Sequence, residues 1–246
     1  MDSSTISGSN LLDALCAADR RLLAPHLREK RYDSGHVFYH PGDDVSHCYF
    51  PRYDSVASFF VSMSAGSAVE TAFVGREGAI GGIVSHGRLP AFARACVMHG
   101  GEFYRIAAND LQRLKNESTG LANLFTRYAD CMVAQMLQSV ACNASHTILQ
   151  RSAKWLLATM DRTGLDKVSM TQDQLGSVLG VGRTYVSRVI RRLKDTKVVE
   201  VRRGVILVID RPGLEALSCE CSAQVAAHFE TVLAGVYPHP DDANVS

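Results

Sequence analysis

The apolar positions divide the chain into a short helical start, a β-rich middle and a largely helical second half. Between Leu11 and Tyr32 they recur at helical spacing, which predicts short helices. From His36 to about Ala107, short runs of β-branched and aromatic residues alternate with turn signals. These runs are Val37–Tyr39, Cys48–Phe50, Val56–Val61, Val69–Val74 and Ala93–Val97. Short strands at this spacing predict an antiparallel, jelly-roll-like β-roll.

A single long helix is predicted from Gly120 to about Ser145. The segment has no proline and no internal glycine up to Asn143, and its apolar residues recur at three- and four-residue steps. Such a helix would be roughly 35 Å long, and a helix from a second subunit could cover its apolar stripe. We expect dimer contacts at Leu121, Leu124, Phe125, Tyr128, Met132, Gln135 and Met136. The alternative is that this helix is buried within its own chain.

Two further helices joined by a glycine turn, followed by a hairpin, are predicted after a helix that ends near Thr163-Gly164. Thr171 is a favourable N-cap for the first helix, and Gly180-Val181-Gly182 forms the turn. The second helix, Arg183 to Lys197, has an inward apolar stripe formed by Val186, Val189, Ile190 and Leu193. Residues 198–209 then form a hairpin with Arg202 and Arg203 at its tip. This order is typical of a winged helix-turn-helix.

The charge is concentrated in this same region. The whole chain has 26 Lys+Arg and 25 Asp+Glu, a formal net charge of +1 that excludes a uniformly basic protein. Residues 171–211, however, hold nine basic and four acidic side chains, a net charge of +5, and the remainder carries −4. A basic helix face on a helix-turn-helix predicts binding to double-stranded DNA.

Roles can be assigned to the basic region from the geometry of such domains. Arg183 and Arg188, near the start of the second helix, are expected to bind guanine O6 and N7 in the major groove. Thr184 and Ser187 would make secondary contacts. Phosphate contacts are expected from Arg191, Arg192, Arg202 and Arg203, and Thr171 is included in the interface.

The complete order of elements resembles the Crp/Fnr superfamily of bacterial transcription regulators. The resemblance rests on His40-Pro41-Gly42-Asp43, on residues 73–78 and on Leu179 to Arg188. It implies an α+β chain with an effector-binding roll at 1–119, a dimerisation helix at 120–145, a winged helix-turn-helix at 146–218 and a tail at 219–246. It also implies a homodimer that recognises a near-palindromic site and acts with RNA polymerase, under control of a small-molecule effector.

The chain departs from the cyclic-nucleotide-binding members at two places. Thr184 stands where the recognition helix of those members has Glu, which puts the preference at the paired cytosine in doubt. The Glu and Arg that bind ribose and phosphate in those members are displaced, with Glu77 and Arg88 the nearest equivalents. We therefore expect an effector other than a cyclic nucleotide, or none. The candidate effector residues are Arg76, Glu77, Gly78 and Arg88.

Other chemistry is less well supported by the sequence. The seven cysteines are scattered without a C-x-x-C pair, so no metal ligand is assigned and an iron–sulfur cluster is not expected, although a role for Cys219 and Cys221 stays open. The start of the chain has no signal peptide and no apolar run spans a bilayer, which predicts a cytoplasmic protein without membrane contact. No enzyme motif occurs. A cupin-like metal enzyme or sensor, using His36 and His40, is the alternative.

Overall fold

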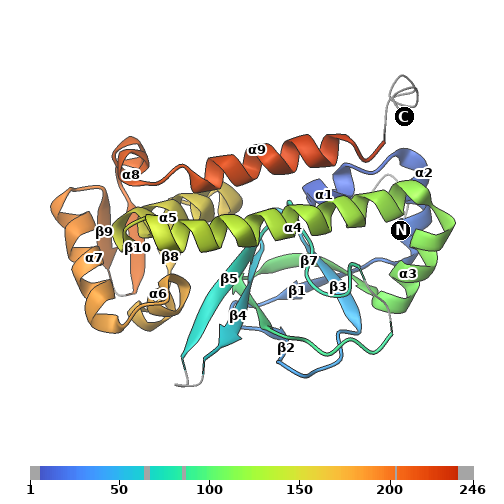
Figure 1. The fold of residues 1–246 in the computed structure, drawn as a ribbon, viewed down its shortest axis with the longest axis horizontal. Helices are drawn as coiled ribbons and strands as arrows, with labels where there is room; N and C mark the ends of the chain where they lie inside the picture. The colour runs from blue at the N-terminus through green and yellow to red at the C-terminus, as the bar shows by residue number, and fades with distance from the viewer. Residues whose placement is uncertain (1–5, 64–66, 85–86, 203, 238–246) are drawn as a thin grey trace.

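The computed structural model describes residues 6–63, 67–84, 87–202 and 204–237 (Figure 1). The N-terminal part is a roll of two antiparallel sheets. One sheet has the order β1-β7-β3 and the other β2-β6-β4-β5. The strands are β1 (Arg28–Tyr32), β2 (Val37–Tyr39), β3 (His47–Pro51), β4 (Val56–Ser62), β5 (Ala68–Val74), β6 (Arg94–His99) and β7 (Gly101–Ala107).

The two sheets enclose an aromatic core. Phe38 stacks on Tyr49 with ring centroids 4.1 Å apart, and Phe103 meets Phe38 edge to face. Residues from both sheets are buried together here, which is how alternating strands of a roll exclude water.

The sequence prediction of helix up to Tyr32 is wrong for its last five residues, which form β1. Four of the five side chains of β1 are exposed, so the strand lacks the apolar alternation by which strands are identified. It forms because its backbone pairs with β7, from Arg28 opposite Arg105 to Tyr32 opposite Gly101. From residue 6 to β1, the helical elements are α1 (Asn10–Asp13), α2 (Ala17–Leu23) and a 3-10 turn.

The roll is followed by α3 (Ala108–Glu117) and by the long helix α4 (Thr119–Ser145). The side chain of Ser118 caps α4 by accepting a hydrogen bond from the Leu121 backbone N–H at 3.1 Å. No helix in the described part of the chain is both long and apolar enough to cross a membrane.

The C-terminal segment is not a simple tail. It contains α9 (Cys221–Ala234), which runs antiparallel along α4 (Figure 1). Phe229 of α9 packs edge to face on Tyr128 of α4, and Arg127 donates to the Val232 carbonyl at 3.0 Å. The Tyr237 hydroxyl donates to the Asp19 carboxylate at 2.7 Å, which anchors the end of the segment to α2.

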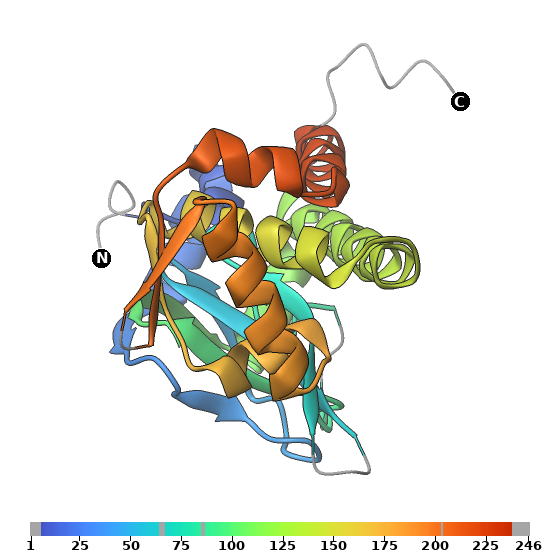
Figure 2. The same ribbon diagram turned by 90° about the vertical axis from the view of Figure 1, so that its left-hand side faces the viewer.

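The remaining elements form a second domain, which lies in front of the roll in the view of Figure 2 and packs against it. They are α5 (Ile148–Thr163), β8 (Lys167–Ser169), α6 (Gln172–Leu179), α7 (Arg183–Asp195), β9 (Val199–Arg202), β10 (Val205–Val208) and α8 (Arg211–Leu217). The small sheet has the order β8-β10-β9. The domain has its own core, to which Val56 and Phe73 of the roll also contribute.

Candidate functional site

Helices α6 and α7 form a helix-turn-helix whose ends are fixed by local sequence. Thr171 and Gln174 form a reciprocal capping box at the start of α6. Gly180 ends α6 with a φ of +67°, a conformation that glycine adopts without steric cost. A side chain at Gly176 would meet the Val181 carbonyl, so this glycine permits the close approach of the turn.

Helix α7 has one buried and one exposed face. Val186, Val189, Ile190 and Leu193 face the core of the domain. The opposite face is exposed and carries the residues expected to contact DNA, namely Arg183, Thr184, Ser187, Arg188, Arg191 and Arg192. The structure therefore places these six side chains together on one accessible, mainly cationic surface.

Two contacts orient the start of this surface. The Arg183 guanidinium lies 3.9 Å from the Asp173 carboxylate, and both side chains are more than two-thirds exposed. The Ser187 hydroxyl donates to the Gln172 side-chain oxygen at 3.0 Å, which links α7 to α6. An exposed ion pair of this kind is worth roughly 1 kcal/mol or less, so Arg183 can exchange Asp173 for another partner at small cost.

The wing is the hairpin of β9 and β10. Arg202 is at its tip with a 78% exposed side chain and pairs with Glu200 of the same strand. Arg203 lies outside the described residues. The Thr171 hydroxyl accepts the capping hydrogen bond from Gln174 N–H, so its position is set by α6.

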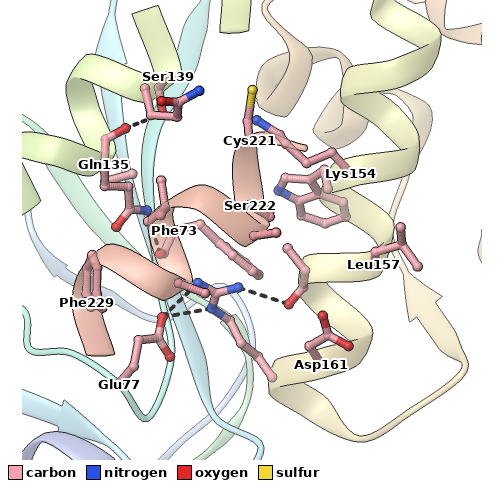
Figure 3. Close-up of a pocket in the computed structure, with 18 of the residues that line it drawn as sticks. Phe73, Glu77, Gln135, Ser139, Lys154, Leu157, Asp161, Cys221, Ser222 and Phe229 are labelled. Carbon is pink, nitrogen blue, oxygen red and sulfur yellow. Dashed lines mark hydrogen bonds and ion pairs between the residues drawn. The ribbon is translucent and has the colours of Figure 1, made fainter. Parts of the chain in front are cut away.

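A cavity of about 790 Å³ lies between the roll and the rest of the chain. Figure 3 shows Phe73 and Glu77 from the roll side, Gln135 and Ser139 of α4, Lys154 and Asp161 of α5, and Phe229 of α9 around it. Its walls thus come from elements that are far apart in the sequence. A ligand here would touch both the roll and the DNA-binding domain.

The candidate effector residues are only partly brought together. Arg76 and Glu77 line the cavity, whereas Gly78 and Arg88 are not among the described residues of its wall. The Glu77 carboxylate is already bound by Arg162 of α5, with N–O distances of 2.8 and 2.9 Å. Gly78 is buried, and a side chain there would collide with the Tyr128 hydroxyl. Of the two nearest equivalents of the nucleotide-binding pair, Glu77 is therefore bound by Arg162, and Arg88 is not among the described residues of the cavity wall.

A second carboxylate joins the roll to α5. Glu70 of β5 accepts hydrogen bonds from the Ser58 hydroxyl at 2.6 Å and from the indole N–H of Trp155 at 2.8 Å. Burial raises the pKa of Glu70 to about 7, although both hydrogen bonds and the nearby Arg162 and Lys154 favour the charged form. Sequence analysis missed this residue because nothing in a strand sequence shows which helix will cover it.

The structure corrects most of the expected dimer interface. Leu121, Leu124, Phe125 and Tyr128 are at most 1% exposed and belong to a core formed with the roll and α9. Met132 packs partly against that core, and Gln135 donates to the Phe73 carbonyl at 3.0 Å. Of the seven, Met136 alone is an exposed apolar side chain. The apolar stripe covers the chain's own roll because α4 passes directly over it.

The structure also collects residues to which no joint role was assigned. Cys142 and His146, one turn apart at the end of α4, lie beside Cys219 and Cys221. The four-residue step from Cys142 to His146 was visible in the sequence, but only the path of α8 and α9 brings the second pair to it. His36 and His40, the residues of the cupin-like alternative, are exposed and belong to no ligand group among the described residues.

Comparison with known proteins identifies the C-terminal domain. Residues 150–217 match the family model of the Crp-like helix-turn-helix domain. A comparison with curated proteins gave no match.

Solved structures with a similar fold include several transcription regulators. A putative regulator of the Crp/Fnr family from Eubacterium rectale is 16% identical, with a TM-score of 0.66 over 84% of this chain and 96% of that one. FixK2 from Bradyrhizobium japonicum is 17% identical, with a TM-score of 0.65 over 78% and 98%. The c-di-GMP-responsive regulator CLP from Xanthomonas campestris is 13% identical, with a TM-score of 0.65 over 79% and 100%. Identities this low show a shared fold. Residues 150–217 are therefore a Crp-like helix-turn-helix domain, and the chain shares its fold with these solved structures.

Proposed function

We propose that this protein regulates transcription by binding duplex DNA, with α7 in the major groove. The observation that carries the proposal is the exposed cationic face of α7, which opposes a fully apolar buried face in a Crp-like helix-turn-helix domain. Arg183 and Arg188 would bind guanine edges, with Thr184 and Ser187 beside them. Arg191, Arg192, Arg202 and Arg203 would contact phosphates, and the N-terminus of α6 at Thr171 would approach the backbone.

The test begins with selection of bound duplexes from a random pool, because the site is unknown. Fluorescence anisotropy then compares wild type with Arg188→Ala on the selected and a scrambled duplex. Loss of a bidentate guanine contact should weaken binding to the selected duplex by about 1–3 kcal/mol, roughly 5- to 150-fold. Arg31→Ala, an exposed arginine in the roll, is the control and should bind like wild type. Equal affinity of Arg188→Ala and wild type for the selected duplex would contradict base recognition by α7.

We further propose that the protein acts as a homodimer through the C-terminal half of α4. Four apolar side chains are exposed there in the i, i+3, i+4, i+7 spacing of a helix–helix seam. They are Val133 at 50%, Met136 at 44%, Leu137 at 66% and Val140 at 68%. The stripe is continuous with the dimer region expected from the sequence but lies one to two turns further along α4. To bind the two half-sites of a near-palindrome, such a dimer would have to hold its two α7 helices about 34 Å apart.

Sedimentation velocity at micromolar concentration tests the dimer. Wild type should sediment as a dimer, and Leu137→Asp as a monomer, because it introduces an unpaired charge at the centre of the seam. Phe92→Asp, at an 84% exposed position in the roll, is the matched control and should remain dimeric. A monomeric wild type, or a dimeric Leu137→Asp protein, contradicts this interface.

The cavity is the proposed site of a small-molecule effector. Its volume of about 790 Å³ is within the range of ligand sites, and its wall joins the roll to α5 and α9. A ligand that contacts both sides would shift the equilibrium between arrangements of the two domains. Cyclic AMP and cyclic GMP are not the expected ligands, because Glu77 is paired with Arg162 and Arg88 is outside the described wall. Saturable binding of either nucleotide in calorimetry would contradict this.

Contact with RNA polymerase belongs to the same proposal. Transcription in vitro from a promoter that carries the selected site should change when the protein is added, and the direction of change distinguishes activation from repression. Arg188→Ala should abolish the change if it depends on DNA binding by α7.

A further inference from the structure

Four potential metal ligands meet at the junction of α4, α5 and α9. Cys142 is in the last turns of α4, and His146 is the residue that caps this helix. Cys219 lies between α8 and α9, and Cys221 is the first residue of α9. The four ligand atoms all lie within 4.8 Å of one another. The three cysteines are buried, and the His146 side chain is 19% exposed.

Two of the distances between these atoms match the edges of a tetrahedron around one metal ion. Zinc binds thiolate sulfur at about 2.3 Å and imidazole nitrogen at about 2.0–2.1 Å, so a regular tetrahedron separates two sulfurs by ~3.8 Å and sulfur from nitrogen by ~3.6 Å. The Cys142 and Cys219 sulfurs are 3.7 Å apart. The Cys221 sulfur is 3.5 Å from the His146 Nδ1.

Two charged neighbours complete the environment. The Lys154 ammonium lies 3.3 Å from the Cys142 sulfur. Three thiolates around one divalent ion leave one net negative charge, which this ammonium balances. The His146 Nε2 faces the Glu220 carboxylate at 3.7 Å. A carboxylate near the second ring nitrogen is the usual neighbour of a metal-bound histidine, and this arrangement leaves Nδ1 available to the metal. At 3.7 Å the Glu220 contact is an electrostatic one rather than a hydrogen bond.

We propose that Cys142, His146, Cys219 and Cys221 bind one Zn²⁺ ion in a closed Cys₃His site. Thiolate and imidazole ligands in tetrahedral arrangement favour zinc among the common biological metals. Four protein ligands leave no open position, so the site is structural rather than catalytic. The ligand atoms enclose the volume of one ion, which is too small for the several iron and sulfide atoms of an iron–sulfur cluster.

The position of the site indicates what the ion would do. It lies beside the short connection between α4, which ends at Ser145, and α5, which begins at Ile148. Arg151 and Lys154 of α5 extend from this region, and Arg151 donates to the Leu179 carbonyl at the end of α6 at 2.8 Å. A bound ion would therefore hold the start of α9 against the joint between the long helix and the DNA-binding domain.

Metal analysis of the full-length protein tests the proposal. Protein purified under reducing conditions should contain one equivalent of zinc per chain by elemental analysis. Cys219→Ser should lose most of it, whereas Cys16→Ser, at an exposed cysteine outside the group, should retain one equivalent. Replacement with Co²⁺ should give the visible absorption of a tetrahedral cobalt–thiolate centre in wild type and in Cys16→Ser.

A second measurement uses only the wild-type protein, so that it tests the site even if Cys219→Ser fails to fold. Metal-free wild-type protein is titrated with Zn²⁺ in competition with a chromophoric chelator, and the melting temperature is followed on the same samples. Stoichiometric binding with a rise in melting temperature supports the site, because an ion that binds only the folded chain stabilises it. Failure to bind zinc under reducing conditions overturns the proposal. Iron and sulfide in place of zinc, or a Cys142–Cys219 disulfide as the sole modification, overturns it too.

Discussion

Glu70 should make the contact between the roll and the DNA-binding domain sensitive to pH, and Glu70→Gln tests this. The glutamine amide can accept the Trp155 hydrogen bond through its oxygen and donate to the Ser58 hydroxyl through its nitrogen. It therefore imitates the protonated carboxyl without titrating. Trp155 is the single tryptophan of the chain, so its fluorescence reports directly on this contact during unfolding.

The magnitude follows from the raised pKa of Glu70. Burial shifts this pKa from 4.5 to about 7, and each unit of difference corresponds to about 1.4 kcal/mol between folded and unfolded states. The folded state holds the proton more tightly, so the contribution of Glu70 to stability is complete below pH 4.5 and is lost as the pH rises to about 7. The loss is on the order of 3 kcal/mol. Arg162 and Lys154, the cations that face the carboxyl, reduce it without reversing its sign.

The assay is urea unfolding of wild type and Glu70→Gln at pH values between 4.5 and 8, followed by Trp155 fluorescence. Other titrating groups cancel in the difference between the two proteins. This difference should be small at the acid end, increase in favour of Glu70→Gln and level off near pH 7. Glu117→Gln, which changes an exposed carboxylate of α3, should give a difference that does not vary with pH. A flat or inverted Glu70→Gln difference would show that the carboxylate remains charged beside Arg162, and the argument from burial would fail.

Four further substitutions test other parts of the structure. Leu193→Ala should lower the free energy of unfolding by about 2–5 kcal/mol in urea denaturation, because Leu193 is 1% exposed in the core beneath α7. Gly78→Ala should cost about 1–3 kcal/mol by the same assay, since its Cβ would collide with the Tyr128 hydroxyl. Gly182→Ala, with open space around the added carbon, should remain close to wild type. Arg202→Gln should reduce the salt dependence of DNA binding by about one unit of slope, measured by anisotropy at several salt concentrations, without changing sequence preference.

Local sequence predicted the DNA-binding region most completely. The capping residue Thr171, the glycine turn and the stripe from Val186 to Leu193 each fix structure within a few residues. The exposed face of α7 follows from that stripe, because a helix with one apolar face must present the other to solvent. Four of the five strands predicted in the roll lie within observed strands, and the fifth begins one residue before β6. Strand β7 was not predicted, and β1 was missed because its exposed side chains show no alternation.

The long helix shows what hydrophobic periodicity along the chain cannot predict. Its periodicity predicted an apolar stripe and a length close to the observed 27 residues of α4, but not the surface that covers this stripe. The roll and α9 cover Leu121 to Tyr128, and the exposed stripe begins only at Val133. Periodicity records that a side chain is buried and contains no information about its distant partner.

The amino-acid sequence alone predicted a Crp-like order of elements, a basic helix in the helix-turn-helix and a displacement of the Glu and Arg that bind a cyclic nucleotide in related proteins. Tertiary structure decided which charges meet, as when Glu77 pairs with Arg162, 85 residues away. It also joined Cys142 and His146 to Cys219 and Cys221, which are more than 70 residues further along the chain. Helix faces and turns depend on residues that are close in sequence. Ion pairs and ligand groups such as these depend on which distant segments the fold brings into contact.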